Sequence, residues 1–203
     1  MRIVAGKFRG RNLVKSDHLK LRPTTDKNRE ALFNILTSGK LGFEIRDSQI
    51  LDMCCGTGAV GFEALSRGAK AVTFVDLSRE HLEVVKKNSV LLEVENSCEI
   101  LCADAKKLSQ NNKQFDLVFV DPPYAEDYLV IVKNLVEKGW IGEKSLVVVE
   151  SQTTKEELGF DGLQLVESRV YGATSFWFFL RNNFVILSVS EGSHEFKLQN
   201  SNS

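Results

Sequence analysis

From residue 49 onward, short apolar runs alternate with stretches of helical periodicity, and this alternation constrains the fold more than any other feature of the sequence. The apolar runs have the length of strands and lie at 49–53, 71–76, 98–103, 115–121 and 145–150. The helical stretches lie at 59–67, 79–91 and 127–138. Such an alternation predicts an α/β fold in which helices cover both faces of a parallel sheet.

Two segments flank this alternation. Beyond it, residues 163–171 and 174–180 predict an antiparallel hairpin that closes the sheet. Ahead of it, Thr24 and Thr25 are candidate N-caps of an amphipathic helix over 26–39.

The chain starts with a segment at 2–14 that interleaves apolar and basic side chains between glycines, which predicts a short hairpin. A length of 203 residues suits a single main domain. We therefore expect an N-terminal basic arm and helix at 1–40 and an α/β domain at 41–181. The polar segment 182–203 is expected to be a disordered tail.

Basic charge is concentrated in the N-terminal segment. Residues 1–30 contain nine Lys and Arg against three acids, whereas the remainder contains 17 basic and 24 acidic residues. Such an asymmetry indicates local contact with a polyanion, although a solvated arm without a partner is the alternative. The candidate contacts with such a polyanion are Lys7, Arg9, Arg11, Arg22, Thr24 and Arg29.

The cysteines and histidines indicate neither disulfides nor a metal site. The four cysteines lie in apolar segments without C-x-x-C spacing and are expected to be reduced and buried. The three histidines have no ligand spacing, so no metal is predicted. No apolar run approaches membrane-spanning length and the start lacks a signal-peptide core, so we expect a soluble, cytoplasmic protein without membrane contact.

The run 50–61 predicts a strand, a glycine turn and the start of a helix. Its glycines, Gly56-x-Gly58-x-x-Gly61, match the dinucleotide-binding fingerprint. Asp76 ends the next strand 20 residues after Gly56, where an acid can hold ribose hydroxyls. The pattern therefore predicts a cofactor that contains a nucleoside.

Asp52 bears on which cofactor binds. Its carboxylate lies just ahead of the glycines, where it would repel the phosphates of NAD but suit a cationic ligand. S-adenosylmethionine has no phosphate and carries a sulfonium and an ammonium, so we predict it as the cofactor, with Asp52 orienting its amino-acid portion. Asp104, at the end of the third strand, is a candidate contact for the adenine amine.

Turn or helix-capping roles remain the alternatives for Asp52, Asp76 and Asp104. The full set of candidate cofactor contacts is Asp52, Cys54, Gly56, Gly58, Asp76, Leu77, Asp104 and Ala105.

The strand at 115–121 delivers Asp121-Pro122-Pro123-Tyr124 at its carboxyl end, the edge where α/β sheets bind ligands. The prolines fix the backbone, so the Asp121 carboxylate and the Pro122 carbonyl can accept the two N–H bonds of an exocyclic amine. These acceptors direct the nitrogen lone pair toward a methyl donor, and the Tyr124 ring can stack on the base. We predict that these four residues are catalytic. A covalent role for Cys54 or Cys55 is disfavoured because both lie on the cofactor turn.

With these motifs the chain resembles the RsmD family, the guanine-N2 methyltransferases of 16S ribosomal RNA. The resemblance rests on four segments, 3–11, 21–30, 56–66 and 118–124. It implies a Rossmann-like, seven-stranded class I methyltransferase sheet with an N-terminal basic extension. It also implies S-adenosylmethionine near Asp52 and Asp76, and as partner 16S ribosomal RNA in an assembled or assembling small subunit. At Cys54 the family more usually has an aromatic residue.

Two other functions remain open at this point. One is another amino-methyltransferase, acting on DNA adenine or a protein glutamine. The chain lacks the length for a separate DNA-recognition domain, and the glutamine enzymes usually have Asn where this chain has Asp121. The other is a non-catalytic RNA-binding assembly factor, against which the intact Asp121 and glycine turn argue.

Overall fold

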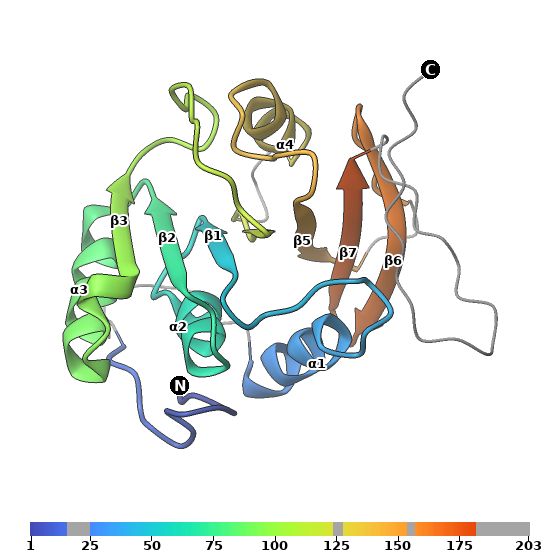
Figure 1. Cartoon of the computed structure of the whole chain (residues 1–203). Coiled ribbons are helices and arrows are strands. Elements are labelled where there is room, and N and C mark those ends of the chain that lie inside the picture. The colour runs from blue at the N-terminus through green and yellow to red at the C-terminus, as the bar shows by residue number, and fades with distance from the viewer. Residues whose placement is uncertain (16–24, 124–127, 154–156, 182–203) are drawn as a thin grey trace.

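The computed structural model describes residues 1–15, 25–123, 128–153 and 157–181, and its strands form one seven-stranded sheet (Figure 1). The strands are β1 Gln49–Met53, β2 Ala71–Asp76, β3 Cys98–Cys102, β4 Leu117–Val120, β5 Leu146–Gln152, β6 Leu163–Tyr171 and β7 Thr174–Arg181. Their order across the sheet is β3-β2-β1-β4-β5-β7-β6. Strands β1 to β5 run parallel, and β7 pairs antiparallel with both β5 and β6. The predicted parallel sheet and its closing hairpin are both confirmed.

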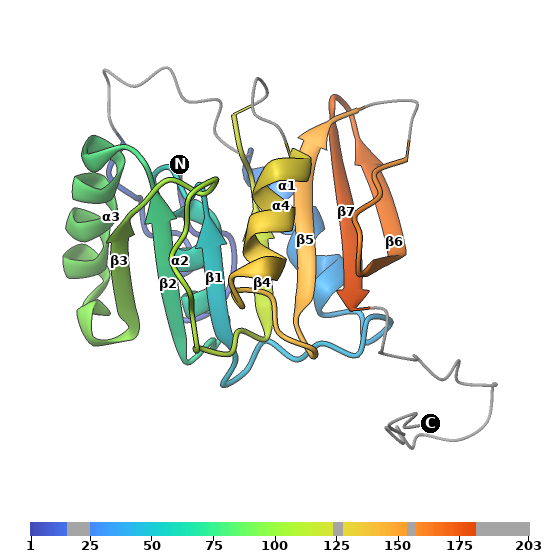
Figure 2. The same ribbon diagram turned by 90° about the horizontal axis from the view of Figure 1, so that it is seen from above.

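The helices cover both faces of this sheet, as predicted. They are α1 Asp26–Leu36, α2 Ala59–Ser66, α3 Arg79–Leu92 and α4 Tyr128–Glu137, with a 3-10 turn at Glu95–Ser97. Helices α1, α2 and α3 lie on one face and α4 on the other, where Figure 2 shows it over β4 and β5. No helix within the described ranges is long and apolar enough to cross a membrane.

Element ends follow local chemistry. Helix α1 begins where predicted because the Thr25 side chain accepts a hydrogen bond from the Asn28 backbone N–H at 3.1 Å. Strand β4 is shorter than the predicted 115–121 and ends at Val120. The two prolines that follow Asp121 have no N–H to donate to the sheet, so the ladder cannot continue through them.

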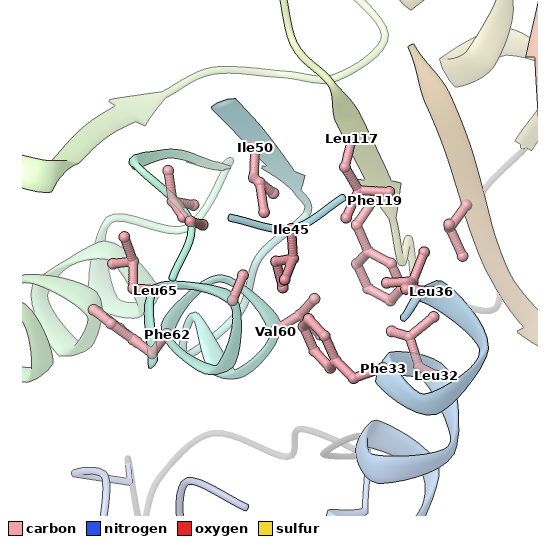
Figure 3. Packing of buried hydrophobic residues seen from close by; sticks show 14 of the residues in the cluster. Leu32, Phe33, Leu36, Ile45, Ile50, Val60, Phe62, Leu65, Leu117 and Phe119 are labelled. Atoms are coloured by element: carbon pink, nitrogen blue, oxygen red, sulfur yellow. The ribbon is translucent and has the colours of Figure 1, made fainter. Parts of the chain in front are cut away.

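The core consists of two apolar clusters, one on each face of the sheet. Figure 3 shows part of the first cluster, in which Leu32, Phe33 and Leu36 of α1 pack toward Val60 of α2 and Phe119 of β4. The three α1 side chains are fully buried. Helix α1 is therefore part of the same core as the sheet.

Candidate active site

A cavity of about 790 Å³ lies along the carboxyl ends of the parallel strands. Most of the predicted cofactor and catalytic residues line it, namely Asp52, Cys54, Gly56, Asp76, Leu77, Asp104, Ala105, Asp121, Pro122 and Pro123. Tyr124 lies outside the described residues. Its lining residues fall into two groups, here called the two halves of the cavity: one at the carboxyl ends of β1, β2 and β3, and the other at the carboxyl ends of β4 and β5.

In the first half, Asp52 is a buried carboxyl group beneath the glycine turn. It is 2% exposed, and its Oδ2 accepts the backbone N–H of Gly61 in the first turn of α2 at 2.9 Å. Burial raises the pKa of Asp52 to about 8, the Gly61 hydrogen bond opposes this rise, and the nearby Asp76 charge adds to it. A cation bound beside this group would favour its ionised form.

Asp76 and Asp104 accept backbone hydrogen bonds from the loops that follow β1, β2 and β3. The Asp76 carboxylate accepts the backbone N–H groups of Gly56 at 2.9 Å and Ser78 at 2.8 Å, and it lies 3.1 Å from Nδ1 of His81. Asp104 accepts the backbone N–H of Lys106 at 2.9 Å. The loops after β1 and β2 are thereby tied together around one carboxylate.

Gly58 and the cysteines differ from expectation. Gly58 does not line the cavity. It has φ of +77°, and a Cβ there would lie 2.8 Å from the Phe62 ring, so glycine permits the turn to close onto α2.

The expected burial of all four cysteines is wrong, because Cys102 is exposed on the edge strand β3 and the others are partly exposed. Burial of its Sγ nevertheless raises the pKa of the Cys55 thiol well above its usual value.

The second half of the cavity is rich in hydrogen-bond acceptors. Asp121, Pro122 and Pro123 follow β4, and Glu150 of β5 lines the same space while being only 4% exposed. Asn28 of α1 and Thr174 of β7 line the same cavity, and Asn28 Nδ2 donates to Thr174 Oγ1 at 3.2 Å. An amine carried by a planar ring would find several oxygen acceptors here.

The N-terminal arm, residues 1–15, folds back on itself as predicted. Ile3 N–H donates to the Arg11 carbonyl at 3.0 Å, and Gly10 N–H donates to the Ile3 carbonyl at 2.9 Å. Figure 1 shows the arm, in dark blue, on the face that carries α2 and α3. Met1 and Lys15, at the two ends of the arm, reach the wall of the cavity.

Glu63 of α2 fastens the arm to the core. Its fully buried carboxylate accepts the backbone N–H groups of Val4 at 2.8 Å and Ala5 at 2.9 Å, and it pairs with Arg67 at 2.9 Å and Arg29 at 3.5 Å. The expectation that Arg29 contacts RNA is therefore wrong. Its guanidinium is fully buried between Glu63 and Asp26, where no phosphate can reach it.

Two further residues hold the arm in place. Ser66 accepts the Phe8 N–H at 3.0 Å, and the backbone approaches so closely that a Cβ on Gly6 would lie 1.9 Å from the Ser66 carbonyl oxygen. Asn88, buried on α3, accepts the Val14 N–H at 2.7 Å and donates to the Thr57 carbonyl of the glycine turn at 3.4 Å. The arm is thus anchored to α2, to α3 and, through Asn88, to the glycine turn after β1.

The remaining basic candidates of the described arm face solvent. Lys7, Arg9 and Arg11 are exposed, and Lys7 Nζ lies 4.6 Å from the centre of the Phe8 ring. Arg22 and Thr24 lie outside the described residues.

The sequence reasoning missed several residues of this site: Glu63, Ser66 and Asn88 as anchors, and Asn28, His81, Glu150 and Thr174 in the cavity wall. For Glu150 a signal was present, because it follows three valines and ends the predicted strand run 145–150, much as Asp121 ends the predicted run 115–121. The anchors carried no such signal, since their partners are far away in the sequence.

The strand order, the reversed closing hairpin and the cavity at the glycine turn define a class I methyltransferase. A solved structure described as "Putative methyltransferase yhhF from Escherichia coli" has the same fold, with a TM-score of 0.77 and 33% identity over 89% of this chain and 97% of that one.

A family model described as "Conserved hypothetical protein 95" matches residues 1–180. The "Ribosomal RNA small subunit methyltransferase D" of Escherichia coli (strain K12) is 39% identical over 153 residues, which is 75% of each chain. Its namesake from Haemophilus influenzae is 35% identical over 87% of this chain and 91% of that one. The chain therefore belongs to this family, the RsmD family, and is a methyltransferase. The non-catalytic alternative is not retained.

Proposed function

We propose that the protein transfers a methyl group from S-adenosylmethionine to the exocyclic N2 amine of a guanine in the 16S ribosomal RNA of the small subunit. The observation that carries this proposal is a single cavity that joins the Asp52 pocket to the acceptors after β4. The names of the similar curated proteins support the ribosomal substrate. The proposal implies a cytoplasmic protein that meets the small subunit during or after its assembly.

The first half of the cavity suits S-adenosylmethionine. A buried carboxyl group whose pKa lies near neutrality gains a partner when a cation binds, so Asp52 fits the ammonium of this molecule. Asp76 and Leu77 would hold the ribose side, and Asp104 and Ala105 the adenine side. When bound, S-adenosylmethionine supplies a methyl group on a positively charged sulfur.

The second half of the cavity suits the amine of a base. This amine is a poor nucleophile because its lone pair is delocalised into the ring. The Asp121 carboxylate and the Pro122 carbonyl can accept its two hydrogens, which localises the lone pair and orients it. The Asp121 carboxylate can also take up the proton that the amine loses. Tyr124 is proposed to stack on the base.

A nucleoside digest of ribosomal RNA tests the proposed function. Small-subunit RNA from a strain that lacks this gene should lose one N2-methylguanosine, and the purified protein with S-adenosylmethionine should restore it. An unchanged content of N2-methylguanosine, or the loss of a methylated adenine instead, would reject the proposal.

The exposed arm cations are proposed to contact RNA phosphates, and a salt titration tests this role. Each neutralised phosphate releases counterions, so the double variant Arg9→Ala plus Arg11→Ala should flatten the plot of log affinity against log salt by about one to two units. The loss should be similar for different RNA sequences, because phosphate contacts do not read bases.

The matched control for this titration is Lys133→Ala plus Lys144→Ala, which removes two exposed cations outside the arm. This control should keep the wild-type slope in binding to the small subunit. If the arm variant also gave a line parallel to that of the wild type, the arm would have no role in RNA docking.

A further inference from the structure

We propose that Glu150 is the residue that selects guanine, by accepting the N1–H of the target base beside the amine that Asp121 holds. The inference rests on the proposed function and names which residue of the same cavity determines its base specificity. It follows from the strand register, the burial of Glu150 and the hydrogen-bonding pattern of the bases.

The register of the sheet places Glu150 next to Asp121. Strands β4 and β5 are parallel neighbours, and Val120 pairs with Val149 at the end of their ladder. Asp121 directly follows β4 and Glu150 is the next residue of β5, and both line the cavity. Neighbouring strands lie about 4.8 Å apart and successive residues alternate between the faces of a sheet, so residues one step beyond the same pair share a face. The two carboxylates can therefore meet adjacent groups of one ligand.

The burial of Glu150 makes its hydrogen-bond partners important for binding. The residue is only 4% exposed, and a carboxylate removed from water requires hydrogen-bond donors. A carboxylate has two oxygens with about four acceptor positions, so Glu150 can hold a contact within the protein and still accept an N–H from a base.

Among the bases with an exocyclic amine, guanine alone has a ring N–H next to that amine. Its N2 amine and N1–H form a row of donors, whereas adenine has an N1 lone pair beside its amine and cytosine has an N3 lone pair. Two adjacent carboxylates therefore match guanine, while adenine or cytosine would bring a lone pair against a negative charge. Sites that bury such polar groups discriminate strongly against a substrate that lacks the matching donor.

The experiment replaces the target guanine, at the position found by the nucleoside digest, in the RNA of reconstituted small subunits. The replacements are 2-aminopurine and 2,6-diaminopurine, which keep the N2 amine but have no hydrogen on N1. Wild-type protein should methylate guanine with a kcat/KM about 10³-fold or more above that for either analogue. Equal kcat/KM values of the wild-type protein on guanine and on the analogues would show that the protein does not recognise N1–H. This result would overturn the inference, regardless of the kinetics of the Glu150 variants.

The variants assign this preference to Glu150. Glu150→Gln can donate to a bare N1, so it should lower kcat/KM on guanine and bring the ratio of guanine to 2-aminopurine within about tenfold. Glu150→Asp keeps the charge and should retain the preference for guanine at a reduced rate. Glu143→Gln, which changes an exposed residue before β5, is the matched control and should behave as the wild type.

Binding of S-adenosylmethionine and the melting temperature are measured in parallel for each variant. Glu150→Gln should leave the donor Kd within a few-fold of the wild type, so these measurements distinguish a role in base specificity from a structural role. A wild-type ratio that persists in Glu150→Gln would refute the assignment to Glu150 while leaving the proposed function intact. Failure of the wild type to methylate any guanine would instead reject the proposed function itself.

Discussion

Substitution of Asp121 by alanine is expected to lower the rate of methyl transfer by about 10²- to 10³-fold, the usual cost of removing one preorganised group that stabilises a transition state. The carboxylate is proposed to accept a hydrogen of the target amine, and Asp121 follows β4, whereas Asp52 lies on β1 and is bound to the first turn of α2. The affinity for S-adenosylmethionine should therefore stay within a few-fold of the wild-type value. Single-turnover rates on small subunits and calorimetric titration of the donor measure the two quantities separately.

Asp161→Ala is the matched control for this change, because it removes an exposed carboxylate in the turn before β6. It should keep both the wild-type rate and the donor affinity. If Asp121→Ala turned over at the wild-type rate, or if it lost donor binding in proportion to the rate, Asp121 would not be the group that positions the amine.

Substitution of Glu63 by alanine is expected to lower the free energy of unfolding by about 3–5 kcal/mol, the range seen when one partner of a buried ion pair is removed. The fully buried guanidinium of Arg29 would lose this partner, and the backbone N–H groups of Val4 and Ala5 would lose their acceptor. Glu30→Ala, an exposed position on α1, is the control and should change stability by less than about 0.5 kcal/mol.

Urea denaturation measures this difference, and amide hydrogen exchange at Val4 and Ala5 shows whether the arm has come loose. Both amides should exchange much faster in Glu63→Ala than in Glu30→Ala. Equal stability of the two variants, with protected arm amides in both, would mean that Glu63 does not anchor the arm.

Hydrophobic periodicity and turn residues were enough to predict the order of the elements, because both signals are local. The parallel strands, helices α2 and α3 and the closing hairpin lie within a few residues of their predicted bounds. The strand bounds differ most at β4, which covers 117–120 where 115–121 was predicted, and at β5, which covers 146–152 where 145–150 was predicted. Local patterns thus define the type of an element better than its ends.

Charge alone was a poor guide to the role of a residue. Lys7, Arg9 and Arg29 look equivalent as cations in the N-terminal segment, yet Arg29 is buried against Glu63, which lies 34 residues further along the chain. Glu63 itself gave no local signal, because its partners are backbone groups of the arm nearly sixty residues away. Only the packing of α2 against the arm shows which charges are neutralised within the protein.

The sequence by itself determined the α/β class, the glycine turn after β1 and the Asp-Pro-Pro motif after β4, since each depends on residues that are neighbours in the chain. The tertiary structure decided which of these residues share a cavity. The sheet order places β1, β4 and β5 side by side although the chain visits two other strands between β1 and β4. This non-local order brings Asp52, Asp121 and Glu150 to one edge, and chain sequence alone does not specify it because strand pairing depends on the packing of the whole sheet.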